Sequence, residues 1–284
     1  MEHQKKILSL VSTCSFIIGD FYDLCKPIFD YKEKFDCPEL VWILGQLCIS
    51  CHLTSESVLI LIGNLKLWDA EILIRSIFEG TIKYLFLSIG NMEERKNKFN
   101  EFIKILPDIS HLKRHKRITT LLEFANSFPE EEADNFRKLL LSENDFNEYT
   151  KKYPKTLIKK IEQKWSFNEM IKEISTAYSD YKSLLGFGYI YGMNSHFIHK
   201  DGDSINLYLD RFFRNEERQL SIELAHSVRE FSDLISMAAL RTKVLLSLYN
   251  HNSDSIKLIF EKYKDFFGET NIIQKEWRNI EAKY

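Results

Sequence analysis

Proline and glycine are scarce in this sequence, with 5 and 10 residues among 284. Sheet proteins with many short strands need these residues at their turns, and disordered chains lack the leucine, isoleucine and phenylalanine that are abundant here. The longest strand-like segment covers only 205–209. These shortages argue against a sheet fold and against disorder, and they favour an ordered all-α protein.

An excess of charge of one sign is also missing, since the formal net charge is -2 at pH 7. The chain therefore has no overall attraction to nucleic acid or to an anionic membrane, and a polyanion would need a local patch. The one basic cluster is 111–117, with the sequence HLKRHKR. No aromatic residues interleave with it, so a solvated helix face is favoured over a phosphate-binding surface.

Long apolar runs are missing as well. In the most apolar region, 40–67, polar residues or glycine interrupt every run after about five residues, whereas a membrane span needs roughly 20. The first residues lack the small-residue cleavage pattern of a secretory signal. We therefore predict buried helices, no membrane partner and a cytoplasmic location.

All five cysteines lie in the first 51 residues, and an odd number on apolar helical stripes indicates reduced thiols. Cys48 and Cys51 have the spacing of a zinc knuckle, but the second pair that a metal would need is missing. The cysteines are predicted to be small buried apolar residues. We predict no cofactor.

Apolar residues recur at spacings of three and four, which predicts long helices. They are expected over 4–35 with a kink at Pro27, and over 38–62, 66–88, 165–185, 189–200 and 215–251, followed by two terminal helices over 252–267 and 271–283. Prolines divide the polar segment 91–164 into short helical pieces. The prediction is one all-α domain, a bundle of long helices with core 1–90 and 165–251, a helical insertion over about 91–164 and C-terminal helices over 252–284.

Two charged residues interrupt the apolar stripe of the expected helix 66–88. Arg75 and Glu79 lie on the same stripe as Trp68, Ile72, Ile82 and Phe86. An i,i+4 ion pair facing water would contribute little, but in an apolar seam it carries a desolvation cost. The sequence is compatible with two interpretations, a functional pair and a buried structural pair.

The densest group of reactive side chains lies in 189–204. On the expected helix, which glycines at 186 and 188 loosen at its start, Tyr191, Ser195 and His199 are at i, i+4 and i+8, with His196 and Lys200 beside them. Histidine exchanges protons near neutral pH, so two histidines and an arginine form an acid/base set for phosphodiester cleavage. Arg75 would stabilise the charge on phosphorus.

Three other interpretations remain open. A serine hydrolase would use Ser195 and His199, but the strand–turn–helix nucleophile elbow is missing. A metal enzyme would combine the histidines at 196 and 199 with Glu79 and with Glu223-x-x-His226, although di-iron bundles need two such Glu-x-x-His units; we predict no metal. In the third interpretation the histidines only cap helices or fill the core.

Two motifs about 120 residues apart resemble one known family. The run Arg75-Ser-x-x-Glu79 and the later run Tyr191-x-x-x-Ser195-x-x-x-His199 are similar to those of a bacterial all-helical family, domain-of-unknown-function family 5677, over roughly 41–209. The resemblance implies that the two helices pack together and form one site. It implies no activity, because the family has none assigned.

The chain also looks like the broader HEPN helical bundles, many of which are ribonucleases of toxin–antitoxin and phage-defence systems. Their signature is an arginine followed four to six residues later by a histidine on one helix. Here Arg218 and His226 are too far apart for it. Arg75 would have to supply the guanidinium from another helix.

Our first hypothesis is therefore a bacterial protein of a phage-defence or toxin-like system that cleaves RNA without a metal. His199 would be the general acid or base, His196 its partner, and Arg75 the phosphate ligand, while Glu79 orients these groups. Ser195 belongs to the same predicted catalytic set, and Tyr191 and Lys200 would bind the substrate. The alternatives are a non-catalytic module that binds a nucleotide or a partner protein, and a metal-dependent enzyme with a His/Glu site. A homo-oligomer is compatible with each.

Overall fold

The computed structural model describes residues 2–30, 37–124, 129–178 and 181–284. The described residues form helices and short connections and contain no strand, which confirms the predicted all-α fold. They divide into two compact units, Met1–Ile89 with Ile171–Tyr284, and Gly90–Met170. The first unit contains the residues that matter for function below.

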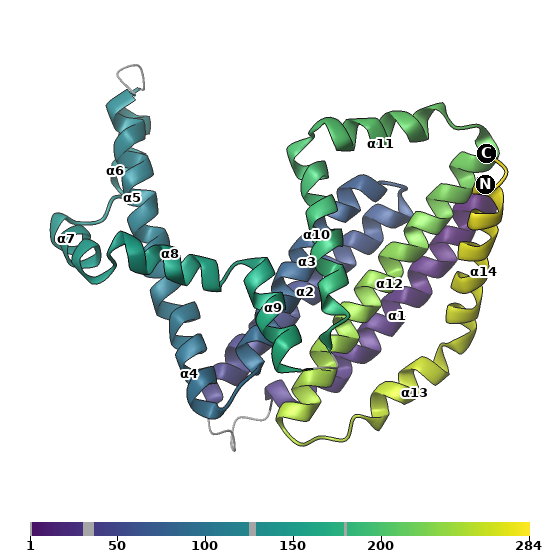
Figure 1. The fold of residues 1–284 in the computed structure, drawn as a ribbon, viewed down its shortest axis with the longest axis horizontal. Helices are drawn as coiled ribbons and strands as arrows, with labels where there is room; N and C mark the ends of the chain where they lie inside the picture. Colours follow the sequence, from purple (N-terminus) through teal and green to yellow (C-terminus); the bar gives the residue numbers. More distant parts are fainter. Residues whose placement is uncertain (1, 31–36, 125–128, 179–180) are drawn as a thin grey trace. The chain divides into compact units, whose positions relative to one another are not determined.

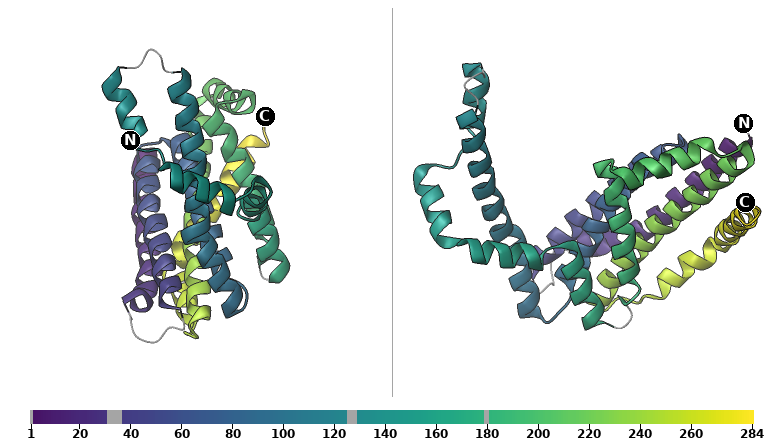
Figure 2. Two further views of the ribbon diagram at one scale, coloured as in Figure 1. Left: turned by 90° about the vertical axis from the view of Figure 1, so that its left-hand side faces the viewer. Right: turned by 45° about the horizontal axis from the view of Figure 1, so that its top comes forward.

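Four long helices form the core of this larger unit (Figure 1). They are α1 (Glu2–Asp30), α2 (Pro38–Gly63), α3 (Leu67–Ser88) and α12 (Glu216–Leu248). Further views show α1 and α12 side by side (Figure 2). Each helix contributes an apolar stripe to one interior, where Phe21, Phe78 and Phe231 are almost completely buried. The four predicted core helices are confirmed, and the part of the first prediction over 31–36 falls outside the described residues.

Two further helices pack against the four-helix core. They are α10 (Leu184–His199), which packs on α3, and α11 (Gly202–Phe213), which follows it. The expected start of α10 at residue 189 is wrong, because Gly186 and Gly188 lie inside the helix. Packing outweighs the roughly 1 kcal/mol that each internal glycine costs: Leu184 is buried and the ring of Phe187 lies 5.3 Å from that of Phe78.

The strand-like segment 205–209 belongs to α11. Asp201 caps this helix by accepting a hydrogen bond from the backbone N–H of Ser204 at 3.3 Å. Lys200, the residue before Asp201, ends α10 in the left-handed backbone conformation with φ 49°. Tyr208 and Arg211 lie on one face of α11 and contact the ring of Trp68 on α3. Side chains of α11 therefore reach the interior of the bundle, although its backbone packs closely against little else.

The C-terminal segment forms α13 (Asp254–Lys262) and α14 (Lys264–Glu281), and α14 packs along α12. The predicted break at 268–270 is wrong, because the chain turns at Tyr263. The Tyr263 hydroxyl donates a hydrogen bond to Asp20 on α1 at 2.9 Å, and Phe266 is buried next to Phe231. These two contacts fix the turn at Tyr263, before the glycine at 268 where the sequence predicted it.

The smaller unit consists of short helices. They are α4 (Met92–Asn100), the π-helical turn η1 (Glu101–Ile105), α5 (Leu106–Phe124), α6 (Glu130–Arg137), α7 (Glu143–Lys152) and α8 (Lys155–Lys164). Glu101 accepts hydrogen bonds from Lys164 and from the Trp165 indole. The basic cluster lies on α5, where Arg114, Lys116 and Arg117 are exposed, as predicted for a solvated face. The helix α9 (Phe167–Ala177) leads back to the larger unit.

Two of the core helices, α1 and α2, are long and apolar enough to cross a membrane by length and composition alone. Buried helices of a bundle core meet the same criterion. Both helices bury one side in this bundle and expose large apolar residues on the other, including Phe16 and Trp42. The absence of a membrane partner therefore stays a prediction.

Candidate functional site

The structure brings together Arg75 and Glu79 of α3 with Tyr191 and Ser195 of α10. The Arg75 guanidinium donates from Nη2 to the Tyr191 hydroxyl at 2.7 Å and from Nη1 to Ser195 Oγ at 3.3 Å. The Tyr191 hydroxyl donates in turn to Glu79 Oε1 at 2.7 Å. Tyr191 thus bridges the two charged residues, whose Nε and Oε1 atoms are 3.6 Å apart. We call these four residues the Arg75 cluster.

The Arg75 cluster lies at the edge of the core. The side chain of Glu79 is 36% exposed and is 3.8 Å from the ammonium group of Lys83, so the pair is not enclosed in an apolar seam. The Arg75 guanidinium lies 4.4 Å from the centre of the Tyr191 ring, a favourable cation–π distance. Burial raises the pKa of the Tyr191 phenol, which keeps its hydrogen as a donor.

The two histidines of the predicted acid/base set are not part of this cluster. His199 is exposed and makes no hydrogen bond or ion pair with another described residue. His196 is 2.5 Å from Asp201 and 3.9 Å from Asp203. The hydrogen bond that His196 donates to Asp201 raises the pKa of the imidazole. Lys200 is exposed at the end of α10. The structure therefore assembles the arginine, tyrosine, serine and glutamate of the predicted site without its histidines or its lysine.

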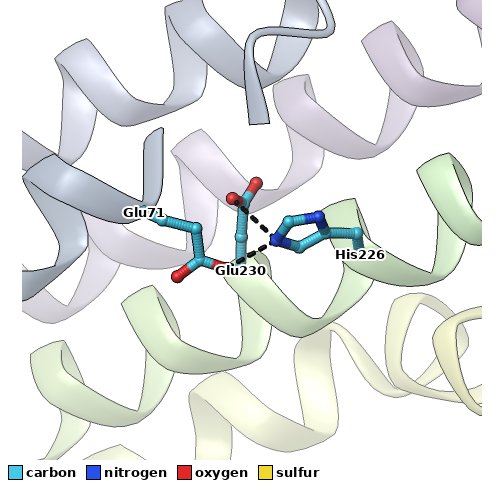
Figure 3. Close-up of side chains that lie close together, drawn as sticks. All are labelled: Glu71, His226 and Glu230. Carbon is cyan, nitrogen blue, oxygen red and sulfur yellow. Dashed lines mark hydrogen bonds and ion pairs between the residues drawn. The ribbon is translucent and has the colours of Figure 1, made fainter. Parts of the chain in front are cut away.

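A second polar cluster begins one helical turn before Arg75 on α3, at Glu71. Its carboxylate faces His226 and Glu230 of α12 (Figure 3). The His226 Nε2 atom lies 2.5 Å from Glu71 Oε1 and 3.4 Å from Glu230 Oε1. Arg229 also forms an ion pair with Glu71 and donates to Asp233 at 3.1 Å. These groups are almost fully buried apart from the half-exposed Arg229.

The other nitrogen of His226 faces α11. Its Nδ1 atom is 2.6 Å from Nη1 of Arg211, whose guanidinium lies 4.0 Å from the centre of the Trp68 ring. Burial and the charge of Arg211 hold the pKa of His226 well below its usual value, so the imidazole is neutral. Because a guanidinium only donates, Nδ1 accepts and the proton on Nε2 points to Glu71.

Burial also perturbs the charged groups around this histidine. It lowers the pKa of Arg211 to about 10 and raises that of Asp233 to about 6. It raises the pKa of Glu230 well above its ordinary value, which favours the neutral acid. Arg229 is neutralised by Glu71 and Asp233. In contrast, among the described residues no carboxylate is within ion-pair distance of Arg211.

The ligand atoms of Glu71, His226 and Glu230 lie within 4.8 Å of one another, as a metal site would require. The proton positions do not fit one. A metal on Nε2 leaves the neutral imidazole protonated at Nδ1, and that hydrogen would face the N–H of Arg211. Glu223 of the expected Glu-x-x-His unit is also elsewhere, 3.3 Å from His3. In a second group, His196 with Asp201 and Asp203, both carboxylates are exposed and Asp201 already caps α11.

A cavity of about 690 Å³ opens beside this cluster. Trp68, Arg211 and His226 contribute to its lining, together with residues of α10, α12, α13 and α14. Most of the remaining lining is aliphatic or aromatic. The arrangement of one large apolar cavity next to a few perturbed polar groups is typical of a ligand site.

The sequence contains a signal for this cavity outside the two family motifs. Glu71 is four residues before Arg75, and on α12 the residues His226, Glu230 and Asp233 lie among the apolar residues of its seam. Charged residues at buried helix positions need partners. Arg211 gave no such signal, because its interior position depends on how α11 returns over the bundle.

The fold and these clusters define an all-α bundle protein with polar side chains from α3, α11 and α12 next to an apolar cavity. A family model described as a family of unknown function, DUF5677, matches residues 41–219, more than half of the chain. The chain belongs to this family. No curated protein and no solved structure matches it. The matched region contains the Arg75 cluster and Arg211 and ends before His226.

Proposed function

We propose that this protein is a non-catalytic binding module that holds a small anionic ligand in the cavity beside α12. One observation carries the proposal. Arg211 is a partly buried cation that lines the cavity and lacks a carboxylate partner among the described residues. A buried charge without a partner is costly to the fold. A ligand carboxylate or phosphate would supply the missing counter-charge.

The geometry around Arg211 suits this role. Only its Nη1 atom has a hydrogen-bond acceptor among the described residues, namely His226, which leaves Nη2 and Nε for the ligand. The Trp68 ring and the His226 imidazole hold the plane of the guanidinium. A pre-oriented guanidinium can bind a carboxylate or phosphate through two parallel hydrogen bonds.

Binding is favoured over catalysis because His226, the histidine that lines the cavity, already has two hydrogen-bond partners. His226 lies between Arg211 and Glu71 in one tautomer, and His196 is held by Asp201. Proton transfer needs a group that can gain and lose a proton near the reacting atom. Neither imidazole is free to do so in this arrangement.

The test is a thermal-shift and calorimetric titration of the full chain with octanoate, AMP and inorganic phosphate. At least one of these anions should bind the wild type and lose about tenfold or more in affinity in Arg211→Gln, since a charge-assisted hydrogen bond contributes roughly 1.5–3 kcal/mol. Arg278→Gln is the control, because Arg278 is an exposed arginine of α14. Equal binding to both variants would overturn the proposal.

RNA cleavage in a phage-defence or toxin-like system is the second candidate. It is favoured by the Arg75 cluster, in which the Arg75 guanidinium donates to Tyr191 and Ser195 on the face of α10 that carries His199 one turn after Ser195. The test is induced expression of the wild type and of His199→Ala with scoring of growth and tRNA integrity. Because His199 is exposed, the variant should fold. Growth arrest with cleaved RNA in the wild type alone would favour this candidate.

A further inference from the structure

The cavity follows one face of α12 rather than enclosing a round volume. From α12 its lining includes His226, Arg229, Ser232, Ile235 and Ser236, which recur at helical spacing. Between residues 226 and 236 an α-helix rises roughly 15 Å. The lining therefore extends along α12, and residues of α10 and α14 also contribute to it.

The two ends of this space differ in chemistry. At one end is Arg211. The indole N–H of Trp277 on α14 is also buried in the lining and has no acceptor among the described residues. Gln274 bonds the carbonyl oxygen of Ala225 at 2.8 Å, so Trp277, one turn later, lies toward the start of α12 and thus toward the Arg211 end. Two unsatisfied donors therefore share that end.

The other end is apolar. Its walls include Ile190 and Met193 of α10, Ile235 of α12, and the rings of Phe260 and Phe267. Aliphatic and methionine side chains form adaptable surfaces for alkyl groups, and burying each CH₂ there contributes about 0.8 kcal/mol. An elongated ligand with one anionic end satisfies both parts of the cavity.

We propose that the ligand is a single-chain anionic amphiphile, with its carboxylate or phosphate at Arg211 and its alkyl chain along α12 toward Phe260. This inference rests on the proposed binding function. It names the class of ligand and the direction in which the ligand lies.

Two other occupants fit less well. A nucleotide base needs an open aromatic face and polar edge partners, but the Trp68 ring already contacts Phe197, Tyr208, His226 and Arg211. A partner helix is too large. A helix of about 10 Å diameter and 15 Å length occupies roughly 1,200 Å³, well above the cavity volume of about 690 Å³.

The experiment compares four probes on the full chain below their micelle concentrations: dodecanoate, acetate, dodecyltrimethylammonium and AMP. Dodecanoate should bind at least about tenfold more tightly than acetate, because ten CH₂ groups become buried. It should also bind more tightly than the cationic amphiphile, and this preference should disappear in Arg211→Gln. Tryptophan fluorescence and calorimetry measure both effects.

Two matched substitutions locate the alkyl chain. Ser232 and Ser247 are both exposed serines of α12, but only Ser232 lines the cavity. Ser232→Trp should weaken dodecanoate binding by about tenfold or more by filling the space that the alkyl chain needs, whereas Ser247→Trp should leave it unchanged. Ser236→Phe provides a second block farther from Arg211.

The outcomes separate this inference from the proposed function. If acetate or AMP binds as tightly as dodecanoate and depends on Arg211, the amphiphile is wrong and the binding function stands. If dodecanoate binds both tryptophan variants equally, it binds elsewhere and the inference is overturned. If no anion binding depends on Arg211, the inference and the proposed function both fall.

Discussion

Nδ1 of His226 lies 2.6 Å from Nη1 of Arg211, and this contact fixes the protonation of the buried cluster. The arginine can only donate, so the imidazole accepts at Nδ1 and carries its hydrogen on Nε2. That hydrogen points to Glu71 at 2.5 Å. One contact between α11 and α12 therefore orders a chain of hydrogen bonds that ends on α3, and it keeps a cation at the edge of the cavity.

Arg211→Met should stabilise the ligand-free protein. Burial lowers the pKa of Arg211 to about 10, and this decrease from its ordinary value corresponds to roughly 3 kcal/mol of cost for the charged form in the folded state. The cation–π contact with Trp68 offsets about 0.5–2 kcal/mol of this cost. The free energy of unfolding in urea should therefore rise by about 1 kcal/mol.

The control for this substitution is Arg278→Met, which changes an exposed arginine and should have little effect on stability. A stability gain at Arg211 together with a loss of anion binding is the behaviour of a functional residue. A loss of more than about 2 kcal/mol in Arg211→Met would instead mean that the arginine is a structural partner of His226.

Zinc provides a test of the histidine tautomer. In the wild type, the N–H of Arg211 opposes the Nδ1 hydrogen that a zinc-bound imidazole would carry, so zinc should not raise the melting temperature. Arg211→Ala removes that donor and should allow Glu71, His226 and Glu230 to bind zinc. Arg211→Ala combined with His226→Ala is the control and should lose the effect. A strong zinc shift in the wild type would contradict the assigned tautomer.

Asp233 should make the protein less stable as pH rises. Burial raises its pKa from 3.8 to about 6, so the folded state binds more protons than the unfolded state between these values. The corresponding stability is fully present below pH 3.8 and is lost as the pH rises through about 6, amounting to at most about 3 kcal/mol. Wild type and Asp233→Asn should be compared by urea unfolding at several pH values.

As the pH rises from 3.8 to about 6, the unfolding free energy of the wild type should fall relative to that of Asp233→Asn. Asparagine can still accept the hydrogen bond from Arg229, so the ion-pair geometry is largely retained. Asp265→Asn, at an exposed position of α14, is the control. A difference that stays constant with pH would show that Asp233 does not titrate in this range.

The sequence predicted the parts of this protein that depend on local periodicity. The core helices followed from apolar spacing, and the meeting of Arg75 with Tyr191 and Ser195 followed from the family motifs. The position of the histidines did not follow. Spacing at i and i+4 places Ser195 and His199 on one helical face, but the neighbouring helix determines which part of that face is covered. That information is tertiary: Arg75 of α3 contacts Tyr191 and Ser195, whereas His199 stays exposed.

The cavity was beyond sequence reasoning for the same reason. The interior position of Arg211 arises because Lys200 adopts a left-handed conformation and Asp201 starts a new helix. The pattern at 205–209 resembles a strand and therefore did not predict that helix. Amphipathic alternation over so short a segment does not distinguish a strand from a helix with two contact faces.

Tyr191→Phe tests whether the Arg75 cluster holds α10 on α3. The substitution removes only the hydroxyl that joins Arg75 to Glu79, and the Arg75 contact with Ser195 remains. Hydrogen bonds to charged groups contribute roughly 1.5–3 kcal/mol when buried. Because this cluster is partly exposed, a loss of about 1–2 kcal/mol of unfolding free energy is expected.

Tyr189→Phe is the matched control on the same helix, since Tyr189 is 73% exposed and should change stability very little. If Tyr191→Phe also leaves stability unchanged, the cluster is not a structural clamp. Its donors would then be available to a substrate phosphate, and the RNA-cleavage candidate would gain support. A loss confined to Tyr191→Phe instead means that the family motif serves first to fix α10, and with it α11 and Arg211, over the cavity.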